Sequence, residues 1–144
     1  EDINKKSIAR GLIEGHVLNL FAGFAKMPVK PKIIHLTGGL SQSKSWCQMI
    51  ADIFNCETVP VKGEGAALGA ATHAAWVWKN ENGFSCGLSQ LVNPFIIFEE
   101  GLRCKPDKKN VETYQNLVLL YDALVNKVRG LEGPDPFKLR RKFF

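Results

Sequence analysis

Residues 33–43 (IIHLTGGLSQS) decide the fold class of this chain. Their first four residues form a short apolar run, which is typical of a strand that is covered on both faces. Gly38 and Gly39 break this run, because glycine favours a sharp turn over an extended strand. Ser41 and Ser43 are both suited to cap a helix that follows the turn. A strand, a glycine turn and a helix in this order predict an α/β unit.

The chain continues with the helix and then a second strand. Apolar residues recur at helical spacing from Trp46 to Ile53 and predict a helix that ends near Asn55. Residues 57–61 (ETVPV) predict a second strand. Pro60 cannot donate a backbone hydrogen bond, so it is expected at the end of this strand or at an exposed edge.

A third helix, rich in small residues, is expected from about Glu64 to Trp78. Glu64 favours the start of this helix because a negative charge stabilises a helix N-terminus. Helical spacing brings four of the small residues together, which lets a backbone or a sheet approach closely. Close packing alone is one explanation for them, and a nearby ligand is another. These four residues are Gly65, Ala66, Gly69 and Ala70.

The flanking segments complete an α/β pattern with more helix than sheet. A first helix is expected over about 4–26 and a long terminal helix over 114–128, because apolar residues recur there at steps of three and four. Residues 80–87 predict a loop, and residues 88–93 predict a short helical turn. Residues 94–98 are expected to form a strand or an extended edge.

Length and composition fit one ordinary globular domain. The chain has 144 residues, of which 45% are hydrophobic and 23% charged, and this excludes a disordered chain, a collagen-like chain and a coiled coil. No apolar run approaches the roughly 20 residues of a membrane span, so no membrane-spanning protein is predicted. The first residue is Glu1 rather than Met, and the chain is therefore expected to be part of a longer protein.

The net charge of +5 is concentrated in two short segments, residues 105–109 and 138–142 (KLRRK). A basic tail can bind a nucleic acid or a membrane surface. No aromatic residues interleave with a basic stripe in the way that stacking on nucleic-acid bases requires. The tail is therefore predicted to be a solvated, frayed terminus, with neither nucleic acid nor membrane as a partner.

Cysteine and histidine spacing gives no metal or catalytic cluster. The cysteines form no C-x-x-C pair, so a structural zinc site is not expected. The histidines lie in three separate segments, which is typical of ordinary core or boundary residues. Reduced thiols in a cytoplasmic protein are the simplest interpretation. The residues are Cys47, Cys56, Cys86, Cys104, His16, His35 and His73.

The glycine turn is the candidate ligand site. It lies at the carboxyl end of a predicted strand, where ligands bind in open α/β sheets. Without a Cβ at Gly38 and Gly39 a ligand can approach the backbone, and the N-terminus of the next helix favours a phosphate. The turn matches neither the dinucleotide-binding pattern nor the P-loop pattern. A turn that serves chain reversal alone is the alternative.

Two longer stretches carry a family resemblance. Residues 37–54 (TGGLSQSKSWCQMIADIF) and then 64–71 (EGAALGAA) resemble the C-terminal domain of the FGGY carbohydrate kinases, with most likeness to the xylulokinase group. Residues 9–20 (ARGLIEGHVLNL) and 114–124 (YQNLVLLYDAL) are similar to the opening and closing helices of that domain. The resemblance implies that residues 1–144 form the C-terminal nucleotide-binding domain of a sugar kinase.

The resemblance also implies a fold and a set of ligands. The fold is the actin-like, ribonuclease-H-like ATPase fold, in which two domains clamp ATP and a sugar between them, with Mg²⁺ assisting. The positions of Gly38 and Gly39 lie against the phosphates and ribose of ATP, and the position of Ser43 lies near the adenine. The family usually has Gly or Ala at the position of Leu40, so this leucine is expected to wall or narrow the ATP site.

The activity implied for the full-length protein is transfer of the γ-phosphoryl group of ATP to xylulose or another pentulose. The sugar site and the catalytic Asp belong mainly to the N-terminal domain, so no catalytic residue and no metal ligand is expected here. Asp52 matches a helix position and not the base. Glycerol or gluconate as the substrate, and a non-catalytic actin-like nucleotide-binding module, are the alternatives. A homodimer is also left open.

Overall fold

The structure is a computed structural model that describes residues 4–63 and 65–144. Two short strands form its sheet, β1 (Ile33–Leu36) and β2 (Glu57–Pro60). The described residues form six α-helices: α1 (Lys5–Phe24), α2 (Lys44–Phe54), α3 (Gly65–Glu81), α4 (Leu88–Val92), α5 (Lys108–Val128) and α6 (Pro136–Phe143). Three 3-10 turns connect them: η1 (Gly39–Gln42), η2 (Asn93–Phe95) and η3 (Glu100–Leu102).

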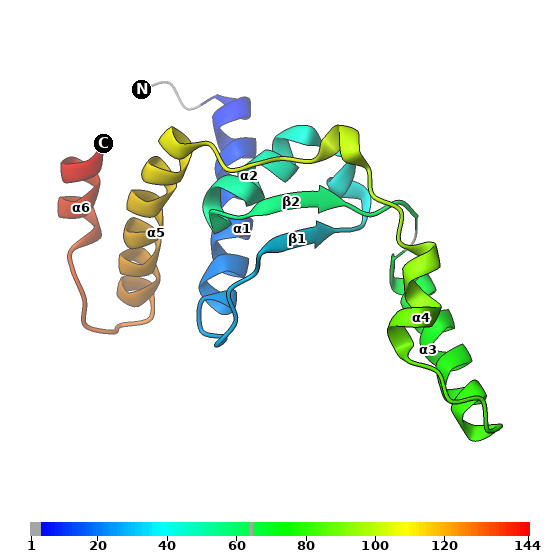
Figure 1. Ribbon diagram of the computed structural model, residues 1–144. Coiled ribbons are helices and arrows are strands. Elements are labelled where there is room, and N and C mark those ends of the chain that lie inside the picture. The colour runs from blue at the N-terminus through cyan, green and yellow to red at the C-terminus, as the bar shows by residue number, and fades with distance from the viewer. Residues whose placement is uncertain (1–3, 64) are drawn as a thin grey trace.

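The centre of the fold is the predicted β1–α2–β2 unit. Its two strands run parallel, with Ile33 opposite Glu57 at one end and Leu36 opposite Pro60 at the other (Figure 1). Ser43 is the N-cap of α2, and the helix stops after Phe54 because its C-cap, Asn55, has a left-handed φ of 46°. The prediction of an α/β unit is therefore confirmed.

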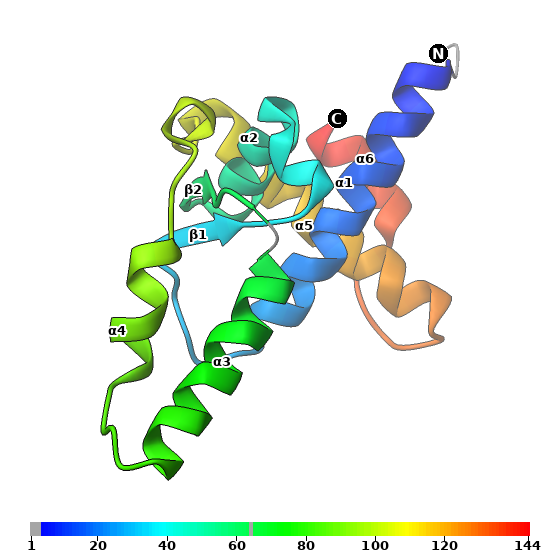
Figure 2. The same ribbon diagram turned by 90° about the vertical axis from the view of Figure 1, so that its right-hand side faces the viewer.

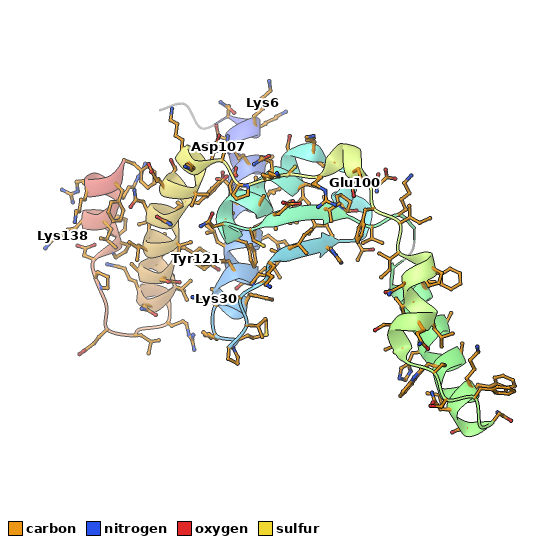
Figure 3. The ribbon with its side chains drawn as sticks, in the orientation of Figure 1. Lys6, Lys30, Glu100, Asp107, Tyr121 and Lys138 are labelled. Atoms are coloured by element: carbon orange, nitrogen blue, oxygen red, sulfur yellow. The ribbon has the colours of Figure 1, made fainter. Side chains whose placement is uncertain are left out.

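Helices α1, α2 and α5 form a helical layer on one side of the sheet (Figure 1). Their buried side chains meet in one core that also contacts the side chains of Ile34 and Leu36 from β1. The Tyr121 hydroxyl lies 3.4 Å from the Asn19 Oδ1 atom, so the tyrosine joins α5 to α1 (Figure 3). The buried members of this core are Val17, Leu18, Ile50, Ile53 and Tyr114.

β2 is the more enclosed of the two strands. One edge pairs with β1, and the other edge carries antiparallel bridges from Thr58 to Cys104 and from Val61 to Phe98. Pro60 lies at the end of the strand, as predicted, but it is less than 2% exposed. The prediction of a strand or an extended edge over residues 94–98 is wrong for Pro94 and Phe95, which belong to the turn η2. It holds for the extended segment from Ile96 to Phe98, where the Ile97 carbonyl oxygen accepts a hydrogen bond from the Lys62 N–H and Phe98 bridges to Val61.

β1 is covered on one face only, and here the prediction was wrong. Ile34 and Leu36 are half-buried against the core, whereas Ile33 is 36% exposed and His35 is also exposed. The reason is that the helical layer packs on one side, while α3 runs away from the sheet (Figure 2). Among the described residues, the opposite face of β1 therefore has little cover.

α3 and α4 form a pair that projects from the rest of the molecule (Figure 1). The Trp76 indole N–H donates a hydrogen bond of 2.9 Å to the Cys86 carbonyl oxygen and ties the connecting loop to α3. The helix extends to Glu81, three residues beyond its predicted end, and Glu64 lies outside the described residues. Nowhere in the described chain does a helix have the length and apolar character needed to cross a bilayer.

The basic tail is a helix, which corrects the prediction of a frayed terminus. The Asp135 carboxylate caps α6 by accepting a 2.9 Å hydrogen bond from the Phe137 N–H, and Pro136 occupies the first turn. α6 packs beside α5, where the Lys127 ammonium lies 5.1 Å from the centre of the Phe137 ring. Lys138 points away from α5 toward solvent, as expected for a solvated charge (Figure 3).

Candidate functional site

The turn after β1 has a backbone conformation that only glycine adopts readily. Gly38 has φ 91° and ψ 176°, a region that costs other residues on the order of 1–3 kcal/mol. The chain then forms the 3-10 turn η1 before α2 begins. Gly39 has no positive φ, so a special conformation does not explain the glycine at this position.

This turn and the start of α3 enclose a hollow of about 400 Å³, the glycine hollow. It lies at the carboxyl ends of the two parallel strands, because β1 leads into the turn and β2 leads toward Gly63 and α3. Parallel strands bring these two ends to the same edge of the sheet. The hollow is lined by Thr37, Gly38, Gly39, Ser41, Gln42, Gly63, Gly65 and Ala66.

The two sides of the glycine hollow differ in free space. A Cβ atom built on Gly38 or Gly39 meets no atom of the described residues within 4 Å. A Cβ atom on Gly65 would lie 2.7 Å from the Thr37 Oγ1 atom, closer than such atoms approach in proteins. The glycine at Gly65 therefore permits α3 to approach β1, and the glycine at Gly39 leaves room in the hollow.

The side chains that the structure describes around the hollow are mostly polar but uncharged. Its lining, within the residues that the structure describes, contains backbone, two hydroxyls and one carboxamide but no charged side chain. The N–H groups of Gly39 and Leu40 donate no hydrogen bond to the described part of the chain. Backbone N–H groups that face open space suit an anion such as a phosphate.

The predicted site residues divide into two pairs. Gly38 and Gly39 line the hollow, whereas Leu40 and Ser43 do not. Leu40 is 55% exposed. The Ser43 hydroxyl accepts a hydrogen bond of 3.4 Å from the Trp46 N–H and so caps α2.

The helix of small residues, α3, lines the glycine hollow with its first turn only. Gly65 and Ala66 line the hollow, whereas Gly69 and Ala70 do not. Sequence reasoning missed Gly63, which lines the hollow with a φ of 84°. Its position just after the second predicted strand was the available signal, because loops at the carboxyl ends of neighbouring parallel strands meet.

The thiol of Cys47 lies behind the turn. All four cysteines are free thiols, as predicted, and Cys47 is fully buried. Burial raises the pKa of the Cys47 thiol above its ordinary value, so the thiol keeps its proton at neutral pH. It donates a hydrogen bond to the Ser41 carbonyl oxygen, with an S···O distance of 3.2 Å.

Asp52 has a structural environment and does not line the glycine hollow. Its carboxylate is 2% exposed and accepts hydrogen bonds of 2.8 Å from the Gln48 amide and the Asp107 N–H, and of 2.9 Å from the Asn110 amide. These bonds fix the start of α5 against α2. The prediction that Asp52 occupies a helix position is consistent with this arrangement.

Comparison with known proteins identifies the family. The model of the FGGY family of carbohydrate kinases, C-terminal domain, matches residues 1–78, more than half of the chain. The chain belongs to the FGGY family of carbohydrate kinases. The matched residues include the glycine turn and the first part of α3, which are the two walls of the hollow. The family resemblance predicted from the sequence is thereby confirmed.

Individual FGGY relatives cover most of the chain. It is 34% identical over 119 residues to a xylulose kinase of Haemophilus influenzae, which is 80% of this chain and 23% of that enzyme. The crystal structure of a ligand-bound xylulose kinase from Lactobacillus acidophilus superposes with a TM-score of 0.72 at 30% identity, over 88% of this chain and 25% of that chain. The crystal structure of the gluconate kinase from the same organism superposes with a TM-score of 0.70 at 31% identity, over 87% of this chain and 25% of that chain.

The chain spans about a quarter of the length of these FGGY kinases. The similar structures agree with the mixed helix-and-sheet fold described above. The likeness therefore concerns one part of a sugar kinase, and the part in question contains the glycine hollow.

Proposed function

We propose that this chain is the C-terminal, nucleotide-binding domain of an actin-like carbohydrate kinase, and that the full-length enzyme phosphorylates xylulose or another pentulose with ATP. Membership of the FGGY family supports a sugar kinase. The names of two similar proteins, a xylulose kinase of known sequence and one of known structure, support a pentulose as the acceptor.

The observation that carries the nucleotide assignment is the open backbone of the glycine hollow. No atom of the described residues lies within 4 Å of a Cβ position built on Gly39, and the Gly39 N–H donates no hydrogen bond to those residues. A phosphate can then approach the main chain at the carboxyl end of β1, where α/β sheets bind ligands. We assign Gly38 and Gly39 to the phosphates and ribose of ATP, with Leu40 and Ser43 farther along the nucleotide.

The described residues around the glycine hollow suit a nucleotide phosphate but offer no set of ligands for a metal ion. Within the described residues, no group of three or more His, Cys, Asp or Glu side chains is arranged to hold a metal. We propose that Mg²⁺ comes bound to ATP, where it would neutralise phosphate charge. Because the described lining of the hollow is neutral, we propose that this charge balance comes from Mg²⁺ and from other groups of the full-length enzyme.

The transfer step needs a group that the hollow does not supply. A sugar hydroxyl oxygen forms a bond to the γ-phosphorus of ATP while the bond from that phosphorus to the bridging oxygen breaks, which releases ADP. The hydroxyl proton must pass to a base. The described residues that line the hollow include no carboxylate or histidine, and we propose that the base and the sugar site belong to the N-terminal domain of the full-length enzyme.

The test compares the full-length enzyme with the 144-residue chain. We expect the full-length enzyme to convert ATP to ADP in the presence of xylulose, and the 144-residue chain to turn over no pentulose. Turnover by the chain alone, after contaminating kinases are excluded, would contradict the domain assignment. A full-length protein that binds ATP but phosphorylates no sugar would instead be the non-catalytic module.

Gluconate is the second candidate acceptor. The likeness to the Lactobacillus acidophilus gluconate kinase is close to the likeness to the xylulose kinase of that organism, with 31% against 30% identity. The same assay with xylulose, ribulose, gluconate and glycerol therefore ranks the substrates by kcat/KM. We expect xylulose to rank first, and a higher kcat/KM for gluconate would reassign the acceptor.

We further propose a cytoplasmic enzyme. The four free thiols support a reducing compartment. If the enzyme forms a homodimer, the apolar side chains of Ile8 and Leu12 on α1, which are 51% and 72% exposed, are the contact that we propose. Sedimentation of the full-length enzyme measures its oligomeric state.

A further inference from the structure

A buried serine holds the glycine turn in place. Ser41 is 2% exposed, although it lies on the 3-10 turn that borders the glycine hollow. Its hydroxyl donates a hydrogen bond of 2.7 Å to the Gly38 carbonyl oxygen. Its backbone N–H donates a second bond of 3.1 Å to the same oxygen. One residue therefore supplies two donors to the carbonyl group of the residue with the glycine-only conformation.

Two further buried groups connect this serine to the sheet. The Cys47 thiol donates to the Ser41 carbonyl oxygen with an S···O distance of 3.2 Å. The Thr58 hydroxyl donates to the Cys47 carbonyl oxygen at 3.0 Å. Cys47 and Thr58 are both fully buried. A continuous hydrogen-bonded path, the turn relay, thus runs from Thr58 in β2 through Cys47 in α2 and Ser41 to Gly38.

We propose that Ser41 is a positioning residue for ATP: its hydroxyl fixes the Gly38 carbonyl group, and Cys47 and Thr58 support it from behind. This inference rests on the proposed nucleotide site. A peptide group in a sparsely populated conformation persists only where its surroundings hold it. Because Gly39 follows directly, the orientation of the Gly38 peptide sets where the Gly39 N–H meets a phosphate.

Loss of the Ser41 hydroxyl is expected to affect ATP binding more than the stability of the domain. The turn relay contains no charged group. Ser41 is not a member of the main hydrophobic core, which is formed by α1, α2 and α5. Loss of the hydroxyl leaves the Gly38 oxygen with one donor. We therefore expect the ATP dissociation constant to rise about fivefold, the ratio that corresponds to one net neutral hydrogen bond. The sugar dissociation constant should stay within about twofold.

The experiment is calorimetric titration of the full-length enzyme carrying Ser41→Ala, with ATP and xylulose as separate ligands. Thr58→Val tests the far end of the turn relay, and we expect a rise in the ATP dissociation constant of about twofold. Thr72→Val is the matched control: Thr72 is 7% exposed and donates to the Leu68 and Gly69 carbonyl oxygens within α3, away from the turn. It should change neither constant.

Each outcome decides the inference. A selective rise for ATP in Ser41→Ala and Thr58→Val, absent from Thr72→Val, supports it. Unchanged ATP binding in Ser41→Ala, or equal weakening of ATP and xylulose, overturns it. If Ser41→Ala does not fold, Thr58→Val decides, and unchanged ATP binding there overturns the inference. A wild-type enzyme that binds no ATP would contradict the proposed function instead.

Discussion

The two walls of the glycine hollow place glycine under opposite constraints. On the β1 side, Gly38 has a φ of 91°, and a Cβ atom there would meet no described atom within 4 Å. On the α3 side, Gly65 has no positive φ, and a Cβ atom there would lie 2.7 Å from the Thr37 Oγ1 atom. One wall needs glycine for its backbone conformation and the other needs it for close packing. Gly39 needs it for neither reason, so the phosphate contact that we propose for Gly39 has to be tested by substitution.

Gly65→Val should have the largest effect on stability. The new side chain forces α3 away from Thr37, and overpacking of this kind costs about 2 kcal/mol in the free energy of unfolding. Urea titration of the chain measures it. Gly69→Val is the control, because Gly69 lies in the same helix with open space around it. Equal losses in both variants would show that packing against Thr37 is not the reason for Gly65.

Gly39→Val should weaken ATP binding at least about tenfold, or about 1.4 kcal/mol, in the full-length enzyme. The branched side chain would occupy the space that we assign to the phosphates, while sugar binding should stay nearly intact. Gly101→Val serves as the control, since Gly101 also has open surroundings and no positive φ but lies outside the hollow. Equal loss of both ligands, or an unfolded protein, would favour a turn that serves chain reversal alone.

Gly38→Ala and Gly39→Ala separate conformation from space. Alanine at Gly38 must adopt a φ near 91°, so the chain should lose about 1 kcal/mol of stability. Alanine at Gly39 meets no atom and needs no special φ, so its stability should stay within about 0.5 kcal/mol of the wild type. Thermal unfolding of the two variants under the same conditions makes the comparison. A larger loss at Gly39 would refute the distinction.

Leu40→Gly should have the smallest effect. Leu40 is 55% exposed and does not line the hollow, so its removal should leave the ATP dissociation constant unchanged or lower it by up to about twofold, through relief of crowding. The measurement is ATP titration of the full-length enzyme, with thermal stability recorded alongside. Binding weakened about tenfold at unaltered stability would show that Leu40 forms a wall of the nucleotide site.

The sequence predicted the elements that have a clear period or a strong breaker. The 33–43 stretch gave the strand, the turn and the cap of α2, because an apolar run, two glycines and a serine each act locally. The sequence analysis does not predict α6, although Asp135 and Pro136 are typical of a helix start, because the basic charge of residues 138–142 favours a solvated terminus. The exposure of Ile33 could not be predicted, since it depends on where α3 lies.

The glycine hollow was predictable only in part, because some of its lining depends on how distant segments pair. Gly38 and Gly39 follow a predicted strand, so a local rule found them. Gly63 and Thr37 reach the hollow through the pairing of two strands, which no local pattern specifies. The role of Ser41 was predicted as a helix cap, whereas its hydroxyl turns back to Gly38. The ATP contacts of all four predicted residues, Gly38, Gly39, Leu40 and Ser43, stay predictions.

The residues that line the glycine hollow are close together in the sequence, and this affects the order of folding. All its lining residues fall between Thr37 and Ala66, whereas the helical layer joins distant segments, as in the 2.9 Å hydrogen bond from the Tyr114 hydroxyl to Glu14, 100 residues away. Short loops close at a lower entropy cost than long ones. We therefore expect hydrogen-exchange protection to appear in the β1–α2–β2 unit before α5 docks on α1. During synthesis, the ribosome would release a formed glycine hollow while the closing helix of the domain was still being made.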